Sequence, residues 1–249
     1  MKPSKLLSLF TGVFTALLVL SASIAVPLLC RPFYYAHIKA LNLDGYTGLS
    51  VEQIKEAFDQ VMDYCLGLRP DFAAGVLPFS ASGASHFADV RVLFLLDLWI
   101  AVISLAALVI LFVLSRKRKL TPAPLLGHGP GFWAAIGLGG LFLIVGGLAA
   151  TNFERAFVVF HSIFFPGKTN WLFDWRTDPI ILLLPEDFFR NCASFDFGAA
   201  GVLVRGAHCR RPAGPAPPQK AGSASRLPLF RLSRRWGLLW VLWLFLKKA

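Results

Sequence analysis

Residues 6–29 read LLSLFTGVFTALLVLSASIAVPLL, an uncharged and mostly apolar run. A helix of about 20 apolar residues crosses the hydrocarbon core of a bilayer, so this run predicts a membrane span. It is longer than the apolar region of a signal peptide, which favours a retained span. Two similar runs follow at 92–114 and 132–151. The sequence therefore predicts an all-α integral membrane protein with three clear transmembrane helices.

The composition agrees with this class. Of the 249 residues, 56% are hydrophobic and 16% are charged, whereas soluble domains carry about 25% charged residues. The net charge of +11 comes almost wholly from the end of the chain, because residues 197–249 hold ten Lys and Arg and no acid. The preceding part shows no basic face interleaved with aromatic residues, so we expect no nucleic-acid partner.

Lysine and arginine set the expected orientation, because cytoplasmic loops of membrane proteins are rich in them. Lys2 and Lys5 precede the first span, and SRKRK at 115–119 follows the second. We therefore expect a cytoplasmic N-terminus and two extracytoplasmic segments, 30–91 and 152–190. Together these segments form a small helical and loop region outside the membrane.

The first outer segment shows a local helical pattern. Ser50 and Gln53 have the spacing of a capping box, and apolar residues then recur at helical intervals up to Cys65. This predicts an amphipathic helix at the bilayer surface. Tyrosine prefers that interface, and the tyrosines gather in the same segment at positions 34, 35, 46 and 64. A disulfide between Cys30 and Cys65 is permitted in this compartment.

Two histidines stand out as candidate catalytic groups. His86 comes just before the second span and His161 just after the third, so both are expected at the outer membrane boundary. Imidazole exchanges protons near neutral pH, which suits a general acid or base. The alternative is that each is a buried histidine with a satisfied hydrogen bond. No third ligand has suitable spacing, so we expect no metal and no cofactor.

Several acids and a loop accompany the histidines. Asp89 lies one helical turn after His86 and either orients its imidazole or pairs with Arg91 or a lipid headgroup. Asp97 lies inside the second span, where an acid is either functional or paired with Arg155. Turn residues fill FPGKTNWLFDWRTDP at 165–179, which predicts a surface or re-entrant loop anchored by its tryptophans.

The two histidine segments together resemble a known family. The pattern FxxFHxxFFPxxxxWxFDxxxDxxIxLLPExFF at 157–189, with FSxSGxxHFxDVR at 79–91, is similar to that of the bacterial lipoprotein intramolecular transacylases. The resemblance covers roughly residues 1–190 and implies four membrane helices with a compact extracytoplasmic part. It also implies a membrane-bound enzyme whose partners are diacylated lipoproteins and membrane lipid.

The activity implied by the resemblance is an acyl transfer. The sn-2 acyl chain of a diacylglyceryl-cysteine lipoprotein moves to the α-amino group of the same cysteine, which gives an N-acyl lyso-form lipoprotein. The family's two catalytic histidines fall on His86 and His161. Its supporting acidic and tyrosine positions correspond to Asp89, Asp174 and Tyr64. Our hypothesis is that His161 is the base and His86 stabilises the oxyanion.

The chain departs from the family after Phe189. Residues 191–249 form a basic tail rich in Pro, Ala and Arg, with a final apolar run too short to span a membrane. The tail is either a genuine linker with an interfacial Trp-rich helix or the product of a shifted reading frame. Two other functions stay open: a membrane hydrolase of lipid esters, and a non-enzymatic assembly or transport protein. No GxSxG motif of a serine hydrolase is present.

Overall fold

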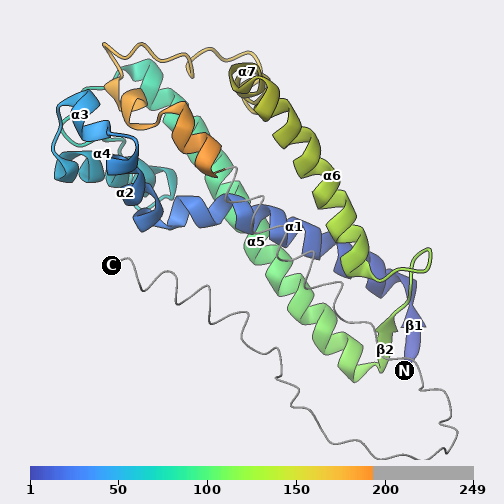
Figure 1. Ribbon diagram of the computed structural model, residues 1–249. Coiled ribbons are helices and arrows are strands. Elements are labelled where there is room, and N and C mark those ends of the chain that lie inside the picture. Colours follow the sequence, from blue (N-terminus) through green and yellow to red (C-terminus); the bar gives the residue numbers. More distant parts are fainter. Residues whose placement is uncertain (193–249) are drawn as a thin grey trace, which may run out of the picture. The chain divides into compact units, whose positions relative to one another are not determined.

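The fold is that of a computed structural model in which residues 1–192 are described (Figure 1). Three helices are long and apolar enough to cross a membrane: α1 (Lys5–Leu29), α5 (Ala81–Lys117) and α6 (Pro130–Thr151). They coincide with the three predicted spans and confirm the predicted class. The tail from residue 193 onward, with both predictions made for it, lies outside the described residues.

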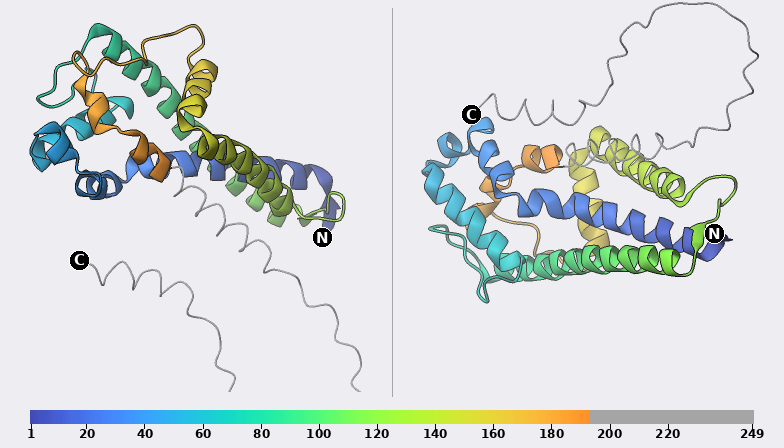
Figure 2. Two further views of the ribbon diagram at one scale, coloured as in Figure 1. Left: turned by 45° about the horizontal axis from the view of Figure 1, so that its top comes forward. Right: turned by 90° about the horizontal axis from the view of Figure 1, so that it is seen from below.

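The three long helices pack on one another through α1, which contacts both α5 and α6 (Figures 1 and 2). With 37 residues, α5 is about 55 Å long, well beyond the ~30 Å of a bilayer core. The apolar run 92–114 occupies its later part. The first turns of α5, which carry His86, therefore extend past that run.

Short elements between α1 and α5 build a compact helical cluster. They are α2 (Arg31–Ala40), α3 (Leu43–Thr47) and α4 (Val51–Cys65). The capping box at the start of α4 is present as predicted: the Ser50 hydroxyl accepts from the Gln53 N–H, and the Gln53 amide oxygen accepts from the Ser50 N–H. These bonds satisfy N–H groups that the first turn of a helix leaves free.

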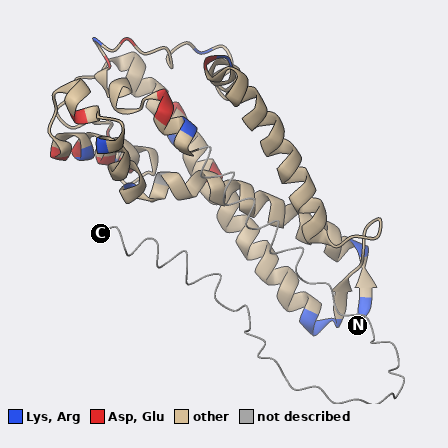
Figure 3. Ribbon diagram, viewed as in Figure 1, with Lys and Arg blue, Asp and Glu red and all other residues tan. Residues whose placement is uncertain are grey.

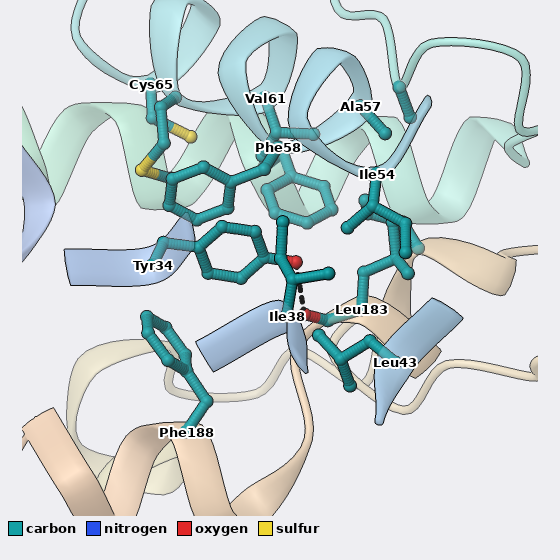
Figure 4. Close-up of a cluster of buried hydrophobic side chains, with 14 residues drawn as sticks. Tyr34, Ile38, Leu43, Ile54, Ala57, Phe58, Val61, Cys65, Leu183 and Phe188 are labelled. Atoms are coloured by element: carbon teal, nitrogen blue, oxygen red, sulfur yellow. Dashed lines mark hydrogen bonds between the residues drawn. The ribbon is translucent and has the colours of Figure 1, made fainter. Parts of the chain in front are cut away.

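The apolar face of α4 packs against α2 and a 3-10 helix, η1 (Pro179–Leu183), to form a buried core (Figure 4). At its centre Tyr34 stacks on Phe58 with ring centroids 3.6 Å apart, and its hydroxyl donates to the Leu183 carbonyl at 2.8 Å. Tyr34 is fully buried in this core, so its ring does not face the bilayer surface.

The possible disulfide does not form. Cys30 is an exposed free thiol, and Cys65 is a free thiol buried on the core face of α4. The same helical period that buries Val61 turns the Cys65 side chain into the core, away from the exposed start of α2.

After α6 the chain turns at Asn152, whose extended backbone ends the helix. The Asn152 side chain accepts from the Arg155 N–H and caps α7 (Phe153–Phe164), which carries His161. A loop at 165–178 then leads to η1. A two-stranded parallel sheet of β1 (Lys2–Ser4) and β2 (Leu120–Pro122) lies at the opposite end of α5 and was not predicted.

Charge is unevenly distributed along the long helices (Figure 3). The end that holds the N-terminus and residues 116–119 carries Lys and Arg without Asp or Glu, whereas the end around α4 carries carboxylates together with Lys and Arg. The two histidine segments lie at this end of mixed charge. This separation places the candidate chemistry far from the basic end.

Candidate active site

The fold brings His86 and His161 together from positions 75 residues apart in the sequence. Their ring centroids are 5.8 Å apart, and each residue is only 5% exposed. His86 lies on the second turn of α5, and His161 lies on the last turn of α7. At this separation both rings can reach groups on one small reacting centre.

Aromatic rings form the walls around the two imidazoles. Phe165 contacts both, with its centroid 5.0 Å from His86 and 5.5 Å from His161. Phe173 meets the His86 ring edge-on at 5.4 Å. Trp171 stacks on His161 at 4.6 Å, with 29° between the rings. The walls of the site are therefore mostly apolar, which strengthens any charge interaction inside it.

The hydrogen bonds of the two imidazoles differ in a way that matters for chemistry. His161 Nδ1 lies 2.8 Å from the Phe157 carbonyl, one helical turn earlier. A carbonyl only accepts, so Nδ1 carries the proton and a neutral ring has its lone pair at Nε2. His86 Nδ1 is buried and has no hydrogen-bond partner within the described part of the chain. An unsatisfied buried nitrogen is costly and is typical of a site that binds a polar group.

Burial also sets the protonation of His161. Removal from water lowers the pKa of its imidazole, although the bond to the Phe157 carbonyl raises it in part. Two protonated imidazoles at 5.8 Å would also repel each other. His161 is therefore neutral at neutral pH, the form that accepts a proton.

Two of the three roles predicted for Asp89 are not seen in residues 1–192: its carboxylate bonds neither to the His86 imidazole nor to Arg91. The third, a contact to a lipid headgroup, stays a prediction. The Asp89 carboxylate instead accepts from the Lys168 ammonium and from Asn170 Nδ2, the latter at 3.1 Å. These contacts tie the 165–178 loop to α5.

The other predicted residues lie outside the two-histidine site. Tyr64 packs under the Arg91 guanidinium and against Phe72. Asp174 is exposed and accepts from the Arg176 N–H at 3.0 Å. Neither one's contacts within residues 1–192 include an imidazole. Both belong to segments near the site in sequence, but their side chains pack locally.

Asp97 is half-buried on α5, with the Ser21 side chain of α1 as a hydrogen-bond partner. The predicted ion pair between Asp97 and Arg155 is not among those of residues 1–192 and is wrong for this structure, because the Asp97 carboxylate bonds to Ser21 instead.

Two features of the site were missed from sequence. Asp178 is a carboxylate only 4% exposed that fastens the loop to the start of α5. Trp171, which was expected to anchor the loop, stacks on His161, a contact that was not predicted. The short spacing from His161 to Trp171 is the one signal that could have placed that tryptophan near the ring.

No group of three His, Cys, Asp or Glu side chains within residues 1–192 could hold a metal ion. A hollow of about 310 Å³ lies between α1 and α6, lined mostly by apolar side chains of both helices. Neither histidine lines it. The chemistry therefore centres on the imidazole pair.

The chain matches a known protein family. A family model described as lipoprotein intramolecular transacylase Lit matches residues 9–189. No curated protein sequence matches the chain.

The fold is similar to that of the integral membrane lipoprotein intramolecular transacylase Lit from Bacillus cereus. One structure has a TM-score of 0.70 at 24% identity and covers 80% of this chain and 92% of its own. Two further structures of that protein carry one histidine replaced by arginine or by alanine. They have TM-scores of 0.64 and 0.65 at 24% identity, and each covers 82% of this chain and 89% or 88% of its own. This chain is thus a multi-pass membrane protein and belongs to the family of lipoprotein intramolecular transacylases, which makes it an acyltransferase.

Proposed function

We propose that this enzyme moves the sn-2 acyl chain of a diacylglyceryl-cysteine lipoprotein to the α-amino group of that cysteine. The product is an N-acyl lyso-form lipoprotein. The observation that carries the proposal is the pair of buried imidazoles, one with its lone pair fixed at Nε2 and the other with an unpartnered Nδ1. Membership of the family supplies the class of substrate.

His161 is the general base in this proposal. As the amine attacks the ester carbonyl, a C–N bond forms and His161 Nε2 takes the amine proton. The ester C–O bond then breaks, and the imidazolium returns that proton to the departing glyceryl oxygen. No proton is gained or lost overall. Because amine and ester belong to one molecule, their proximity supplies much of the rate without an acyl-enzyme.

His86 is the oxyanion stabiliser. The tetrahedral intermediate carries negative charge on the former carbonyl oxygen, and a ring N–H of His86 donates to it. A preorganised donor in an apolar site is worth far more than the same donor in water. The nitrogen without a partner in the free enzyme is satisfied by the substrate.

The active site faces the extracytoplasmic side. The opposite end, around the N-terminus and residues 116–119, carries Lys and Arg without any Asp or Glu, and such uncompensated basic residues favour the cytoplasm (Figure 3). The histidine end therefore meets lipoproteins anchored in the outer leaflet. The 165–178 loop covers both imidazoles, so the lipid ester reaches them when this loop moves aside.

Mass spectrometry of a lipoprotein N-terminal peptide, from cells with and without the protein, tests the proposal. An N-acyl lyso form that depends on the protein supports transfer. A lyso form with a free amine indicates ester hydrolysis instead, and an unchanged lipoprotein indicates a non-enzymatic role. A matched variant, His161→Ala, is expected to leave the lipoprotein diacylated.

A further inference from the structure

Asp178, itself a buried residue, joins the 165–178 loop to the start of α5 through hydrogen bonds. Its Oδ1 accepts from the Ser80 N–H at 2.7 Å, and its Oδ2 accepts from the Thr177 hydroxyl at 2.9 Å. Ser80 is the residue that caps α5, and its hydroxyl accepts from the Gly83 N–H at 2.9 Å. A carboxylate also suits the positive end of a helix dipole. The loop is thereby fastened to the first turn of α5.

The contact needs a glycine at position 83. A Cβ on Gly83 would lie 2.2 Å from Asp178 Oδ1 and 3.1 Å from Phe173 Cε1. The distance to Asp178 is far shorter than a Cβ can tolerate, and the distance to Phe173 is tighter than most normal contacts. The loop therefore packs on bare helix backbone at this point.

This junction lies one helical turn from the chemistry. Gly83 and His86 are three residues apart on α5 and so share a face. Phe173 meets the Gly83 position and also packs edge-on against His86. Trp171, two residues earlier, stacks on His161. The placement of the loop on α5 therefore fixes ring contacts to both imidazoles.

The other tether of the loop is weaker. Lys168 and Asn170 bond to Asp89, but the Lys168 side chain is half exposed, and exposed ion pairs contribute little. Asp178, in contrast, is 4% exposed and fully bonded. When the loop moves for substrate entry, the Lys168 end can release while the Asp178 end holds.

We propose that Asp178 is a positioning residue that, through Ser80, Gly83 and Phe173, holds the 165–178 loop in register with His86 and His161. It touches neither substrate nor reacting atoms. The proposal rests on the proposed function of the two histidines. Asp178 affects how accurately the two imidazoles are placed once substrate is bound. Its loss is therefore expected to lower kcat rather than to raise KM.

Steady-state kinetics of the purified full-length protein in lipid nanodiscs, on a synthetic diacylglyceryl lipopeptide, test it. Asp178→Ala is expected to lower kcat about 100-fold, the scale of a misplacement near 1 Å, with KM changed less than about threefold. Asp178→Asn keeps most of the rate, because its amide oxygen still accepts from Ser80 and its NH₂ can donate to Thr177. Asp187→Ala is the matched control, since that exposed carboxylate contacts only Arg190 in the ion pairs found.

A double-mutant cycle adds a second line of evidence. Gly83→Ala alone lowers kcat because its methyl displaces the Asp178 carboxylate. In the Asp178→Ala background the same change costs less than it does alone, since the closest clash partner is gone and only the tight contact with Phe173 at 3.1 Å is left. Two results overturn the proposal. One is that the kcat losses of Gly83→Ala and Asp178→Ala multiply in the double variant. The other is an Asp178→Ala kcat equal to that of Asp187→Ala.

Nuclear magnetic resonance of ¹⁵N-histidine separates this proposal from the proposed function. Ring signals of His86 and His161 are expected to shift or broaden in Asp178→Ala and Gly83→Ala but not in Asp178→Asn or Asp187→Ala. Unchanged ring signals overturn the positioning role even where a variant folds poorly. If the wild-type enzyme does not transfer acyl chains but the ring signals still shift in the variants, the transfer reaction is rejected and the positioning role is kept.

Discussion

Replacement of Trp171 by leucine tests whether the ring stacked on His161 serves catalysis. The indole lies 4.6 Å from the imidazole, and its Nε1 donates to the Lys168 carbonyl at 3.0 Å. An aromatic pair is worth about 0.5–1.5 kcal/mol beyond its buried area. If that energy holds the imidazole in place for proton transfer, its loss slows the reaction roughly 2- to 13-fold, since 1.36 kcal/mol is tenfold in rate.

The same change has a signed effect on the pH profile. Trp171 shields His161 from water, and burial lowers the pKa of that imidazole. Without the indole, water returns and the pKa rises toward its ordinary value of about 6.5. The neutral ring is the active base, so the acidic limb of the rate profile moves to higher pH in Trp171→Leu. Initial rates of acyl transfer between about pH 5 and 8 measure both effects.

Trp175→Leu is the matched control. Trp175 lies in the same loop, is 56% exposed and packs against the Arg176 guanidinium. Its loss is expected to leave the rate and the pH profile of the wild type unchanged. The reasoning fails if Trp171→Leu behaves like Trp175→Leu in both measurements.

Three further predictions follow from the same contacts. Tyr34→Phe leaves the buried Leu183 carbonyl without its donor and should lower the free energy of unfolding by about 1–3 kcal/mol in a denaturant titration in micelles; no measurable change would contradict the core described above. In the wild type, the transfer rate should first fall as the substrate α-amine, with an ordinary pKa of about 7.7–8.0, becomes protonated, and the lowered pKa of His161 should add a second loss only below pH 6.5; a second loss above pH 6.5 would count against a buried base. Asp89→Asn removes the partner of Lys168 and should change the rate less than about fivefold, because exposed ion pairs are worth about 0–1 kcal/mol; a loss of 1000-fold in rate assays would mean that Asp89 acts directly in the reaction.

Local signals in the sequence predicted the local structure. The capping box and apolar period from Ser50 to Cys65 gave helix α4 with the correct start and end. Long uncharged runs gave the three spans. Positions of His86 and His161 relative to two spans placed both at one end, and the structure brings their rings to 5.8 Å. This prediction was possible because residues that flank membrane spans on the same side of the bilayer lie at a similar depth.

Contacts that depend on long-range packing were not predictable. Asp178 bonds to Ser80 across 98 residues, and nothing in either local sequence marks the pair. Asp89 had the correct helical spacing to His86, yet Lys168 and Asn170 from a distant loop compete for its carboxylate. Tyr34 lies in a segment rich in tyrosine, as is typical of a membrane interface, but its hydroxyl donates to the buried Leu183 carbonyl of η1. In each case a segment remote in sequence decides the partner.

A crossover experiment with the purified enzyme tests the central claim most directly. Two diacylglyceryl lipopeptides of different peptide sequence, one with a deuterated sn-2 chain, are mixed with wild-type protein or with His161→Ala. The account predicts that wild-type protein gives two N-acyl lyso products, each keeping its own acyl chain, and that His161→Ala gives neither. Products with exchanged chains, or transfer by His161→Ala at the wild-type rate, would contradict it.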